Sequence, residues 1–481
     1  MEDDSCSNKS LIHVFLVSFP GQGHVNPLLR LGKRLASKGM LVTFCTPECI
    51  GRDMRRVNDN ITDRPTPYGA GSIRFEFFDG WEFGQTGAEN RMELELQTLE
   101  LVGRRELPLI LKKQARPVSC LINNSFIPWV CDVAESFGIP NAVLWVQSCA
   151  SFSAYYHFNF DLVPFPTDGR PEMEVEIPGM PVLSHDEVPG FLHPRGARFH
   201  ALRTTILDQF KKMSVPFCFL VDSFEELEAD IIRHMSGICT VKTVGPLLFK
   251  EEEGNDVRAD LVSSDNSIME WLESKPLSSV VYISSGSIAL PSQEQVNEIA
   301  KALIKARVCF LWIMKSQAKY YQPIELPEGF LDKVGDHGKV VEWCPQERVL
   351  AHPSIACFMT HCGWNSTMEA IAYGVPVLTF PYFGDQVLNA KFLVDEFKTG
   401  LRLSRGVFEN RTISCDEIEK CLTQVMSGGL EAGELKENAL KWRKKAEEAV
   451  ADGGSSDRNI EQFVNEIMRR TRNKKLEESS N

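Results

Sequence analysis

The chain has 481 residues, which is more than one ordinary hydrophobic core accommodates, so two or three domains are expected. Hydrophobic residues make up 43% and charged residues 24% of the sequence, as in soluble globular proteins. The formal net charge of −13 disfavours nonspecific binding to nucleic acid, which requires a basic surface, but it permits a local anion site built from backbone N–H groups.

The N-terminal segment and the cysteines indicate the cellular compartment of the protein. The first apolar run, Leu11–Phe19, is short and interrupted by His13, so neither a signal peptide nor a membrane span is predicted. The fourteen cysteines contain no CxxC pair, which leaves zinc sites and disulfide frameworks unsupported. We therefore expect a cytoplasmic protein whose thiols are kept reduced.

The first half of the chain opens with a strand–helix–strand pattern. Leu11–Phe19 and Leu41–Cys45 read as strands buried on both faces, the type found in parallel sheets. Between them Asn26 is expected to cap a helix, with Pro27 at its first position and Gly39 just past its end. Further buried strands are predicted at 118–123, 142–146 and 217–221.

The same pattern restarts at Ser279 with a strand and the small-residue loop SSGS. Ser292 and Gln295 resemble a capping box, and an amphipathic helix follows it. The polar stretch 250–256 reads as a linker between two α/β domains. Such domains bind ligands at the carboxyl ends of their strands, and we expect a cleft between the two. Later strands are predicted at 309–314, 339–342, 355–360 and 377–380, and helices at 366–373, at 432–451 and from Asp457 onward.

A turn rich in polar side chains follows the strand predicted at 355–360. It reads His361-Cys-Gly-Trp-Asn-Ser366 and leads into a predicted helix. Glycine lets the backbone approach a ligand closely, and a helix start offers free N–H groups and the positive end of a dipole, which suit a diphosphate. A helix cap beside a core histidine would give the same pattern.

Other polar and aromatic residues recur near this turn. Trp343 ends a predicted strand, where it either fills the core or offers a flat face to a base. Glu369 lies four residues past Asn365 and either accepts from ribose hydroxyls or faces solvent. Asp385 and Gln386 follow a predicted strand and either bind sugar hydroxyls or close a turn. Their combined spacing favours a site for a nucleotide, a diphosphate and a sugar.

His24 is the candidate catalytic base. It follows the turn Gly21-Gln22-Gly23, and an ordinary histidine pKa of about 6.5 suits proton transfer near pH 7. A structural histidine is the alternative. The two glycines also begin a dinucleotide-binding pattern, but Asn26 stands where GxGxxG requires its third glycine, so a nicotinamide site is less favoured.

Two stretches resemble the plant family of UDP-glycosyltransferases. Residues 343–386, WCPQERVLAHPSIACFMTHCGWNSTMEAIAYGVPVLTFPYFGDQ, are similar to its signature box, and FPGQGHVNP at 19–27 is an independent match. The resemblance covers nearly the whole chain and implies the α/β fold called GT-B, with two facing Rossmann-like domains and a cleft between them. The expected boundaries are 1–249 for an acceptor-binding domain, 250–264 for the linker, 265–456 for a UDP-sugar-binding domain, and 457–481 for a helix that returns to the first domain.

The resemblance also implies individual roles. Trp343 would stack on uracil, while Gln346 and Glu369 would hold the ribose. The family associates a terminal glutamine in the box with glucose, so UDP-glucose is the expected donor. Cys344 belongs to the same UDP-sugar-binding set. The diphosphate would be held by Ser287, His361, Asn365 and Ser366, the sugar would be contacted by Trp364, Asp385 and Gln386, and acceptor contacts would come from Gln22, Phe126 and Gln147.

The implied mechanism is a single displacement with inversion at the anomeric carbon. His24 would take the acceptor proton or orient the nucleophile. The helix dipole and the donors around it would stabilise the leaving UDP, so no metal ion or other cofactor is expected.

One position departs from the family pattern. Family members carry an Asp that pairs with the catalytic histidine in a segment similar to CLIxDxF, and here Asn124 stands in its place. An Asn can orient His24 but supplies no charge. A carboxylic acid is already ionised at pH 7, whereas a phenol with a pKa near 10 is not. We therefore hypothesise that the acceptor is a carboxylic acid.

Within the family, the stretches at 19–39 and 121–140 most resemble enzymes that form 1-O-β-glucose esters of hydroxycinnamates and hydroxybenzoates such as gallate. The expected partners are UDP-glucose and a phenolic acid, with no nucleic acid or membrane partner, and the expected state is a monomer. The alternatives are a flavonoid or phenol O-glucosyltransferase, a limonoid or hormone-acid glucosyltransferase, and a nucleotide-sugar-binding protein without catalytic activity.

Overall fold

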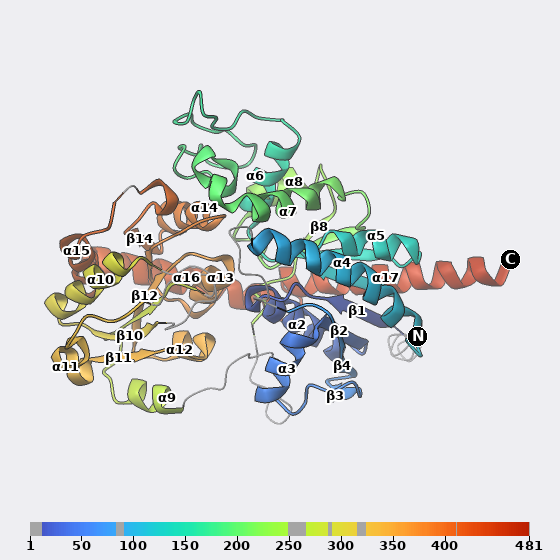
Figure 1. The fold of residues 1–481 in the computed structure, drawn as a ribbon, viewed down its shortest axis with the longest axis horizontal. Coiled ribbons are helices and arrows are strands. Elements are labelled where there is room, and N and C mark those ends of the chain that lie inside the picture. Colours follow the sequence, from blue (N-terminus) through green and yellow to red (C-terminus); the bar gives the residue numbers. More distant parts are fainter. Residues whose placement is uncertain are drawn as a thin grey trace. The chain divides into compact units, whose positions relative to one another are not determined.

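The computed structural model describes residues 12–82, 91–248, 266–286, 291–314, 324–409 and 411–480. Its chain divides into two compact units (Figure 1). The first unit comprises Met1–Cys149, Phe199–Ser263 and Ala449–Asn481, and the second comprises Ala150–Arg198 and Ser264–Glu448. The stretch 150–198, which we expected in the N-terminal domain, therefore groups with the second unit. The expected linker at 250–264 lies outside the described residues, as does Ser287.

A largely parallel sheet forms the centre of the first unit. Its strand order among the described residues is β3-β4-β2-β1-β5-β6-β7-β8, and the β3–β4 pair alone is antiparallel. Strands buried on both faces read as continuous apolar runs, which is why β1 and β2 were recognisable in the sequence. The strands are β1 (His13–Val17), β2 (Leu41–Pro47), β3 (Thr66–Tyr68), β4 (Gly71–Phe78), β5 (Cys120–Asn124), β6 (Asn141–Trp145), β7 (Cys218–Val221) and β8 (Val241–Thr243).

Helices cover both faces of this sheet. On one face α2, α3 and α17 share a hydrophobic core with the strands, and on the other α4 and α5 do so. The helices that begin in this unit are α2 (Gln22–Ser37), α3 (Glu48–Val57), α4 (Arg91–Lys112), α5 (Trp129–Ser136), α6 (Cys149–Asn159), α7 (His200–Lys211), α8 (Ala229–Met235) and α17 (Ser455–Ser480).

The second unit contains an all-parallel sheet in the order β11-β10-β9-β12-β13-β14 among the described residues. This is the Rossmann order 3-2-1-4-5-6. The strands are β9 (Val280–Ser284), β10 (Cys309–Ile313), β11 (Gly338–Val341), β12 (Ile355–Thr360), β13 (Val377–Thr379) and β14 (Gly400–Arg402). The helices are α9 (Asn266–Glu273), α10 (Gln293–Ala306), α11 (Phe330–Val334), α12 (Gln346–Ala351), α13 (Trp364–Tyr373), α14 (Gln386–Lys391), α15 (Cys415–Met426) and α16 (Leu430–Val450).

Helix α2 begins earlier than predicted. Its N-cap is Gly21 rather than Asn26, so His24 lies in the first turn of the helix and Pro27 lies inside it. Pro27 is the sixth helical residue, so it removes one i→i−4 backbone donor from within the helix. The predicted end is confirmed, because Gly39 follows the helix with a φ of 97°.

The predicted cap of α10 is half of a capping box. The Ser292 hydroxyl accepts from the Gln295 backbone N–H, as expected. The Gln295 side chain, however, exchanges two hydrogen bonds with the backbone of Ile413 instead of returning to the cap. It therefore joins α10 to the segment before α15, where Ser414 and Glu417 form a complete capping box that we did not predict.

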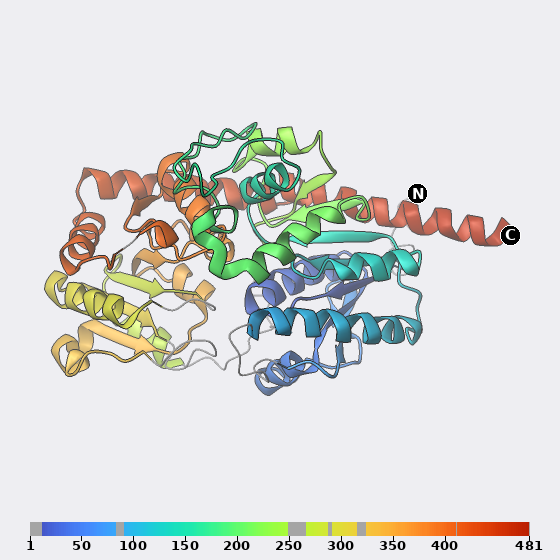
Figure 2. The same ribbon diagram turned by 45° about the horizontal axis from the view of Figure 1, so that its top comes forward.

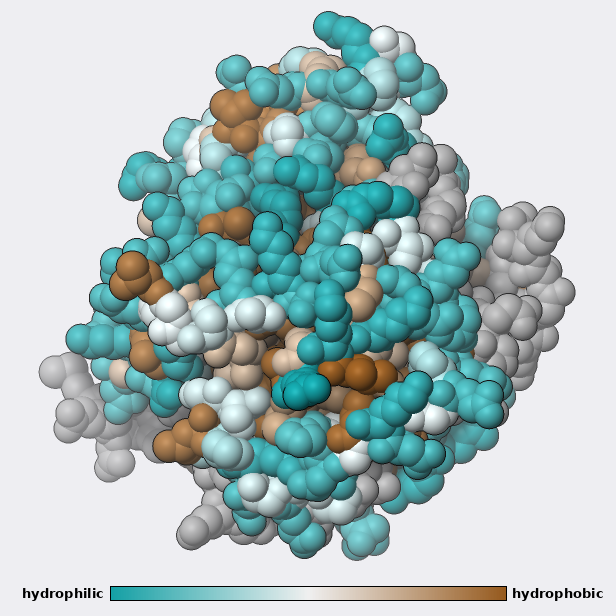
Figure 3. All heavy atoms as spheres, turned by 90° about the vertical axis from the view of Figure 1, so that its left-hand side faces the viewer, coloured by the Kyte–Doolittle hydropathy of each residue, from teal (hydrophilic) through white to brown (hydrophobic). Residues whose placement is uncertain are grey.

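The surface on the side of α10, α11 and α15 is mostly hydrophilic (Figure 3). Large hydrophobic residues are exposed singly, for example Ile304 on α10 and Leu331 on α11. Such isolated residues are normal on a protein surface. None of the helices in the described part of the chain combines the length and the apolar character that crossing a membrane requires.

Helix α17 completes the core of the first unit (Figure 2). Phe463 is buried and stacks on Phe217 with ring centroids 5.6 Å apart. Asn459 donates to the carbonyl of Thr243 in β8 at 3.0 Å, and Lys38 of the α2 C-cap pairs with Asp457. The helix therefore closes one face of a sheet whose strands lie more than 200 residues earlier.

Replacing Phe463 by Ala is expected to lower the free energy of unfolding of the first unit by about 3–5 kcal/mol, because a buried aromatic ring is removed from a packed core. Chemical denaturation of the purified variant measures this change. Asn473→Ala, at an exposed position of the same helix, is the control and should leave the midpoint unchanged. Equal midpoints for the two variants would contradict the packing described here.

Candidate functional site

Both sheets contain a point where successive connections leave in opposite directions. In the first unit β1 lies between β2 and β5, and in the second β9 lies between β10 and β12. Open parallel sheets bind ligands outside the carboxyl ends of the strands at such a switch point. The carboxyl ends of β1 and β5 lead to His24 and Asn124, while those of β9 and β12 lead to Gly286 and His361.

The imidazole of His24 has apolar neighbours. Phe19 and Phe126 lie edge-on to it, with ring centroids at 4.9 and 5.3 Å. The residue as a whole is half-buried, but its Nδ1 is fully enclosed and has no hydrogen-bond partner among the described residues. Burial lowers the pKa of His24 to about 3, so the ring is neutral at pH 7.

Asn124 does not contact the imidazole through a hydrogen bond, in contrast to our expectation that it orients the ring directly. Its Nδ2 donates to the backbone carbonyl of His24 at 3.0 Å, and its Oδ1 accepts from the backbone N–H of Phe19 at 2.8 Å. The amide therefore holds both sides of the turn between β1 and α2. It places His24 through the main chain, and among the described residues the ring has no hydrogen-bond partner at Nδ1.

The three predicted acceptor contacts lie on the first unit. Phe126 packs on His24 and has a φ of 73°, a left-handed conformation that is uncommon for an aromatic residue. Gln22 is the first residue of α2 and is half-buried. Gln147 follows β6 and is 8% exposed. The structure thus brings Phe126 into contact with His24.

His361 is enclosed by two glycines. A Cβ atom at Gly286 would lie 2.5 Å from the His361 Nε2, and one at Gly363 would lie 2.4 Å from the same atom. Only glycine lets the two backbone segments approach the ring this closely. Gly363 is the N-cap of α13, so the ring lies next to the free N–H groups and the positive dipole end of that helix.

Gln346 links the predicted ribose and diphosphate residues. Its Nε2 donates to Glu369 Oε2 at 2.6 Å and to Ser366 Oγ at 2.8 Å. Its Oε1 accepts from the hydroxyl of Tyr282 at 2.9 Å. Gln346 belongs to α12, Ser366 and Glu369 belong to α13, and Tyr282 belongs to β9. Glu369 is 5% exposed. The structure therefore joins Gln346, Ser366 and Glu369 in one network.

Asp385 and Gln386 lie at the turn between β13 and α14. Asn389 donates from its Nδ2 to Asp385 Oδ2 at 2.8 Å and to the carbonyl of Cys362 at 2.9 Å. The Gln386 Oε1 accepts from the backbone N–H groups of Tyr382 and Phe383, so its amide NH₂ is the part that can donate to a ligand. Burial raises the pKa of Asp385 to about 6, and the hydrogen bond from Asn389 acts in the opposite direction.

The other predicted residues differ in exposure. Trp343 follows β11 and is half-buried, which leaves part of the indole surface accessible. Trp364 is buried at the first position of α13, next to Asn365. Cys344 is buried, its Sγ lies 3.3 Å from the Tyr282 hydroxyl, and burial raises the pKa of this thiol to about 12. The Cys344 thiol therefore supports Tyr282.

Two supporting residues escaped sequence analysis. Tyr282 is fully buried in β9 and stacks on Phe358 with ring centroids 4.7 Å apart, and Asn389 lies on α14. Tyr282 read as an ordinary apolar strand residue. Asn389 lies four residues after Asp385, a helical spacing that places the two side chains on one face and could have identified the pair.

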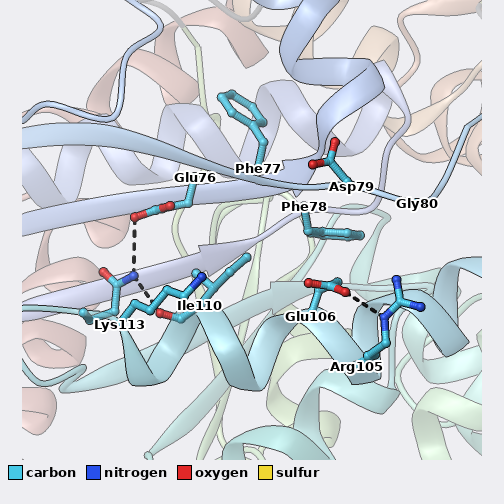
Figure 4. Close-up of a pocket in the computed structure, with 10 residues that line it drawn as sticks. Glu76, Phe77, Phe78, Asp79, Gly80, Arg105, Glu106, Ile110 and Lys113 are labelled. Atoms are coloured by element: carbon cyan, nitrogen blue, oxygen red, sulfur yellow. Dashed lines mark hydrogen bonds and ion pairs between the residues drawn. The ribbon is translucent and has the colours of Figure 1, made fainter.

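A polar pocket of about 370 Å³ lies elsewhere in the first unit, between β4 and α4 (Figure 4). Glu76 accepts from Gln114 there, and Arg105 pairs with Glu106. None of the predicted site residues lines it. The described residues contain no group of three or more histidines, cysteines or carboxylates arranged to hold a metal ion.

The buried carboxyl of Asp385 should reduce stability as pH rises. Between about pH 4 and 6 the unfolded chain ionises this group while the folded protein keeps its proton, so the folded state loses up to roughly 3 kcal/mol. Asp385→Asn removes this loss, and its stability relative to the unmodified protein should increase from pH 5 to 7.5 in denaturation experiments. Asp59→Asn, on an exposed turn, should show no such trend. A difference for Asp385→Asn that does not change with pH would contradict the buried carboxyl.

Known proteins share both the sequence and the fold. The family model described as UDP-glucoronosyl and UDP-glucosyl transferase matches residues 259–444. Over 96% of its length the chain is 56% identical to a cinnamate beta-D-glucosyltransferase of Fragaria ananassa, covering 84% of that protein. It is 57% identical to a gallate 1-beta-glucosyltransferase of Punica granatum, with 96% of this chain and 90% of that protein covered. It is also 57% identical to a limonoid UDP-glucosyltransferase of Citrus unshiu, with 96% of this chain and 91% of that protein covered.

Among solved structures, Os79 from O. sativa in complex with UDP matches with a TM-score of 0.80 and 28% identity, covering 94% of this chain and 100% of that one. The relatives that are more than half identical extend over nearly the whole chain. Together with the two Rossmann-like units, these matches show that the protein is a GT-B transferase and belongs to the plant UDP-glycosyltransferase family.

Proposed function

We propose that the protein transfers glucose from UDP-glucose to the carboxylate of a phenolic acid, a hydroxycinnamate or a hydroxybenzoate, and forms a 1-O-β-glucose ester with inversion at the anomeric carbon. The observation that carries this proposal is the uncharged surroundings of His24, whose enclosed Nδ1 has no polar partner among the described residues. Relatives with cinnamate and gallate in their names support the acceptor class.

The missing partner at Nδ1 affects which ring nitrogen carries the proton. A general base at Nε2 needs its proton on Nδ1, where an enclosed N–H would lack an acceptor at a cost of about 1–3 kcal/mol. The other neutral tautomer has the N–H at Nε2. His24 is therefore better suited to donating a hydrogen bond than to removing a proton.

A hydrogen-bond donor is what an anionic nucleophile requires. A phenolic acid is ionised at pH 7, so one carboxylate oxygen can attack the anomeric carbon while the bond from that carbon to the UDP oxygen breaks. No proton has to leave the acceptor. His24 would orient the carboxylate, whereas a phenol with a pKa near 10 would need a base that His24, with a pKa of about 3, cannot supply.

The second unit would hold the donor. The amide network of Gln346 and Glu369 would bind the ribose, with Trp343 beneath the uracil. The N-terminus of α13, with His361, Asn365 and Ser366, would bind the diphosphate and stabilise the negative charge that develops on the leaving UDP. Because these donors provide the stabilisation, the proposal assigns no step to a metal ion.

Asp385 and Gln386 would select glucose. Their groups complement each other, since the Asp385 carboxylate would accept from sugar hydroxyls and the Gln386 NH₂ would donate to them. Ser287 and Trp364 would complete the UDP-sugar contacts, and Gln22, Phe126 and Gln147 would contact the acceptor. We further propose a cytoplasmic monomer, a location that suits the thirteen free thiols of the described residues.

The limonoid relative supports a second candidate acceptor. Its identity of 57% equals that of the gallate relative, so overall similarity does not separate a limonoid from a phenolic acid. The apolar edge formed by Phe19 and Phe126 next to His24 would suit either kind of ring system. The acceptor panel described below therefore includes a limonoid.

The acceptor class is tested with phenolic acids matched to phenols that lack the carboxyl group, using UDP-glucose and the purified protein. Products are expected from the acids, and mild alkali should cleave them as esters. The rate should stay nearly constant between pH 7 and 8, because the acceptor carboxylate, the Asp385 carboxylate and the neutral His24 all persist over this range. Alkali-stable products from both sets would instead indicate phenol glycosylation.

Asn124→Asp tests the role of the uncharged turn. The new carboxylate would be repelled by the carbonyl oxygen of His24 and would turn toward the imidazole ring. Its negative charge would raise the pKa of His24 and make the ring a better base. The ratio of phenol to acid glucosylation should therefore rise at least about tenfold. The ratio is internal, so loss of folded protein cancels. Asn123→Asp is the matched control, because Asn123 bonds to Asn141 on the other side of β5 and its substitution should leave the ratio unchanged. An unchanged ratio in Asn124→Asp would refute the argument from Asn124.

Gly363→Ala tests the diphosphate assignment. The backbone at this position, with a φ of −60°, accepts alanine, but the new Cβ would displace the His361 ring. Affinity for UDP, measured by calorimetry, should fall roughly 10- to 100-fold. Gly433→Ala on α16, where a Cβ would meet nothing within 4 Å, is the control and should bind UDP normally. Unchanged affinity for UDP in Gly363→Ala would contradict the assignment of His361 to the diphosphate site.

A further inference from the structure

The loop between α6 and α7 reaches the turn that carries Asp385 and Gln386. This loop includes a short 3₁₀ helix at Gly190–Leu192, and it lies beside α14 (Figure 1). The backbone N–H of Gly190 donates to the carbonyl of Gly384 at 2.7 Å. Both residues belong to the second unit although they are almost 200 positions apart. The donor of this bond lies outside the signature box, and its acceptor directly precedes Asp385.

Phe191 supports the same turn from the side. Its ring is 2% exposed and lies against Gly384, where an added Cβ would meet the ring at 3.3 Å. It also packs on Phe383 with ring centroids 6.1 Å apart. Gly384 has a φ of 66°, a left-handed conformation that reverses the chain just before Asp385.

The turn is also closed from within. The Gln386 Oε1 accepts from the backbone N–H groups of Tyr382 and Phe383. Gly190 and Phe191 contact the turn at Gly384 and Phe383, and Gln386 holds the segment that precedes it. The direction of the Gln386 amide NH₂, and the place of the Asp385 carboxylate next to it, therefore depend on both sets of contacts.

Ion pairs hold this loop to the second unit. Asp186 Oδ2 lies 2.6 Å from Arg405 Nη1, and Glu187 Oε1 lies 3.4 Å from Arg402 Nη2. His193 packs edge-on to Phe408 with ring centroids 4.8 Å apart. The two ion pairs precede Gly190 in the sequence and the His193 contact follows Phe191. The loop is therefore attached to the second unit on both sides of these two residues.

We propose that Gly190 and Phe191 are positioning residues for the donor sugar: they set the turn of Asp385 and Gln386 and thereby control which sugar is transferred, without contributing to nucleotide affinity. The inference rests on the proposed function, in which Asp385 and Gln386 contact the sugar. Its physical basis is that hydrogen-bonding groups discriminate between epimers only when they are held in place. The proposed nucleotide contacts lie on α12, α13 and the loops that precede them, whereas the contacts of Gly190 and Phe191 described above are with Phe383 and Gly384.

The test is Phe191→Ala, with kcat/KM measured for UDP-glucose and UDP-galactose and with the Kd of UDP alone. The variant leaves a space beside Gly384 and frees the turn. We expect kcat/KM for UDP-glucose to fall about tenfold, the preference for glucose over galactose to fall about fivefold, and the Kd of UDP to stay within about twofold. A fall in UDP affinity equal to the fall in kcat/KM would overturn the proposal, as would an unchanged sugar preference.

Two comparisons separate positioning from general damage. Phe330→Ala also removes a buried phenylalanine from the second unit, but Phe330 packs on Phe310 and Trp312, so the sugar preference should not change. If Phe191→Ala does not fold, Arg405→Gln loosens the loop from an exposed ion pair and should lower the preference about two- to threefold. Arg411→Gln removes another exposed ion pair, to Glu417, and should leave the preference intact. An unchanged preference in Arg405→Gln would overturn the proposal when Phe191→Ala is unfolded.

The outcome for the unmodified protein distinguishes failure of the two proposals. No transfer from UDP-glucose by that protein would contradict the proposed function itself. Normal transfer by the unmodified protein, together with an unchanged preference in Phe191→Ala, would contradict only the positioning role.

Discussion

The parallel pairing of neighbouring strands is the constraint on which the candidate site depends. Val17 at the end of β1 lies opposite Cys45 of β2 and Asn123 of β5, and Ser284 at the end of β9 lies opposite Ile313 of β10 and Thr360 of β12. Because these strands run in the same direction and end at the same edge, the loops that follow them start close together. His24 and Asn124 thus become neighbours from positions 100 residues apart. The alignment requires no special residue in the loops, and it leaves their side chains free to differ between members of one fold.

Asn124 shows how one side chain can settle two properties at once. By donating to the carbonyl of His24 and accepting from the N–H of Phe19, its amide fixes the turn between β1 and α2. A carboxylate has no hydrogen to donate and could not make the first of these bonds, so the residue that holds the turn by both bonds cannot also charge the histidine. The apolar contacts of Phe19 and Phe126 then keep the imidazole neutral. A turn held by an uncharged amide and a neutral imidazole together favour an acceptor that is already ionised. The uncharged amide is in turn required by the two backbone hydrogen bonds, one donated and one accepted by Asn124.

The sequence predicted those parts of the fold in which local pattern and tertiary burial agree. Continuous apolar runs marked β1, β9 and β12, because strands in a doubly covered parallel sheet are buried on both faces. It missed β4, whose sequence GSIRFEFF mixes polar and apolar residues, and it placed the start of α2 too late because Asn26 and Pro27 imitate a cap. The site residues within one local motif were predictable. Tyr282, Gly190 and Phe191 were not, because each acts through a partner that only folding brings near.

The two sets of candidate residues also differ in how much order they have before any ligand binds. On the second unit, Gln346 already bonds Glu369 and Ser366, and Gln386 already closes its own turn. In the proposed site, ribose hydroxyls would therefore exchange for an existing hydrogen bond, and nucleotide affinity would come mainly from stacking and from charge at the helix start. On the first unit the enclosed Nδ1 of His24 has no hydrogen-bond partner in the described part of the chain, and on the second the carboxyl of Asp385 is buried at a cost. Both arrangements lower the stability of the folded protein, and strain or poorly satisfied polar groups of this kind persist where function requires them.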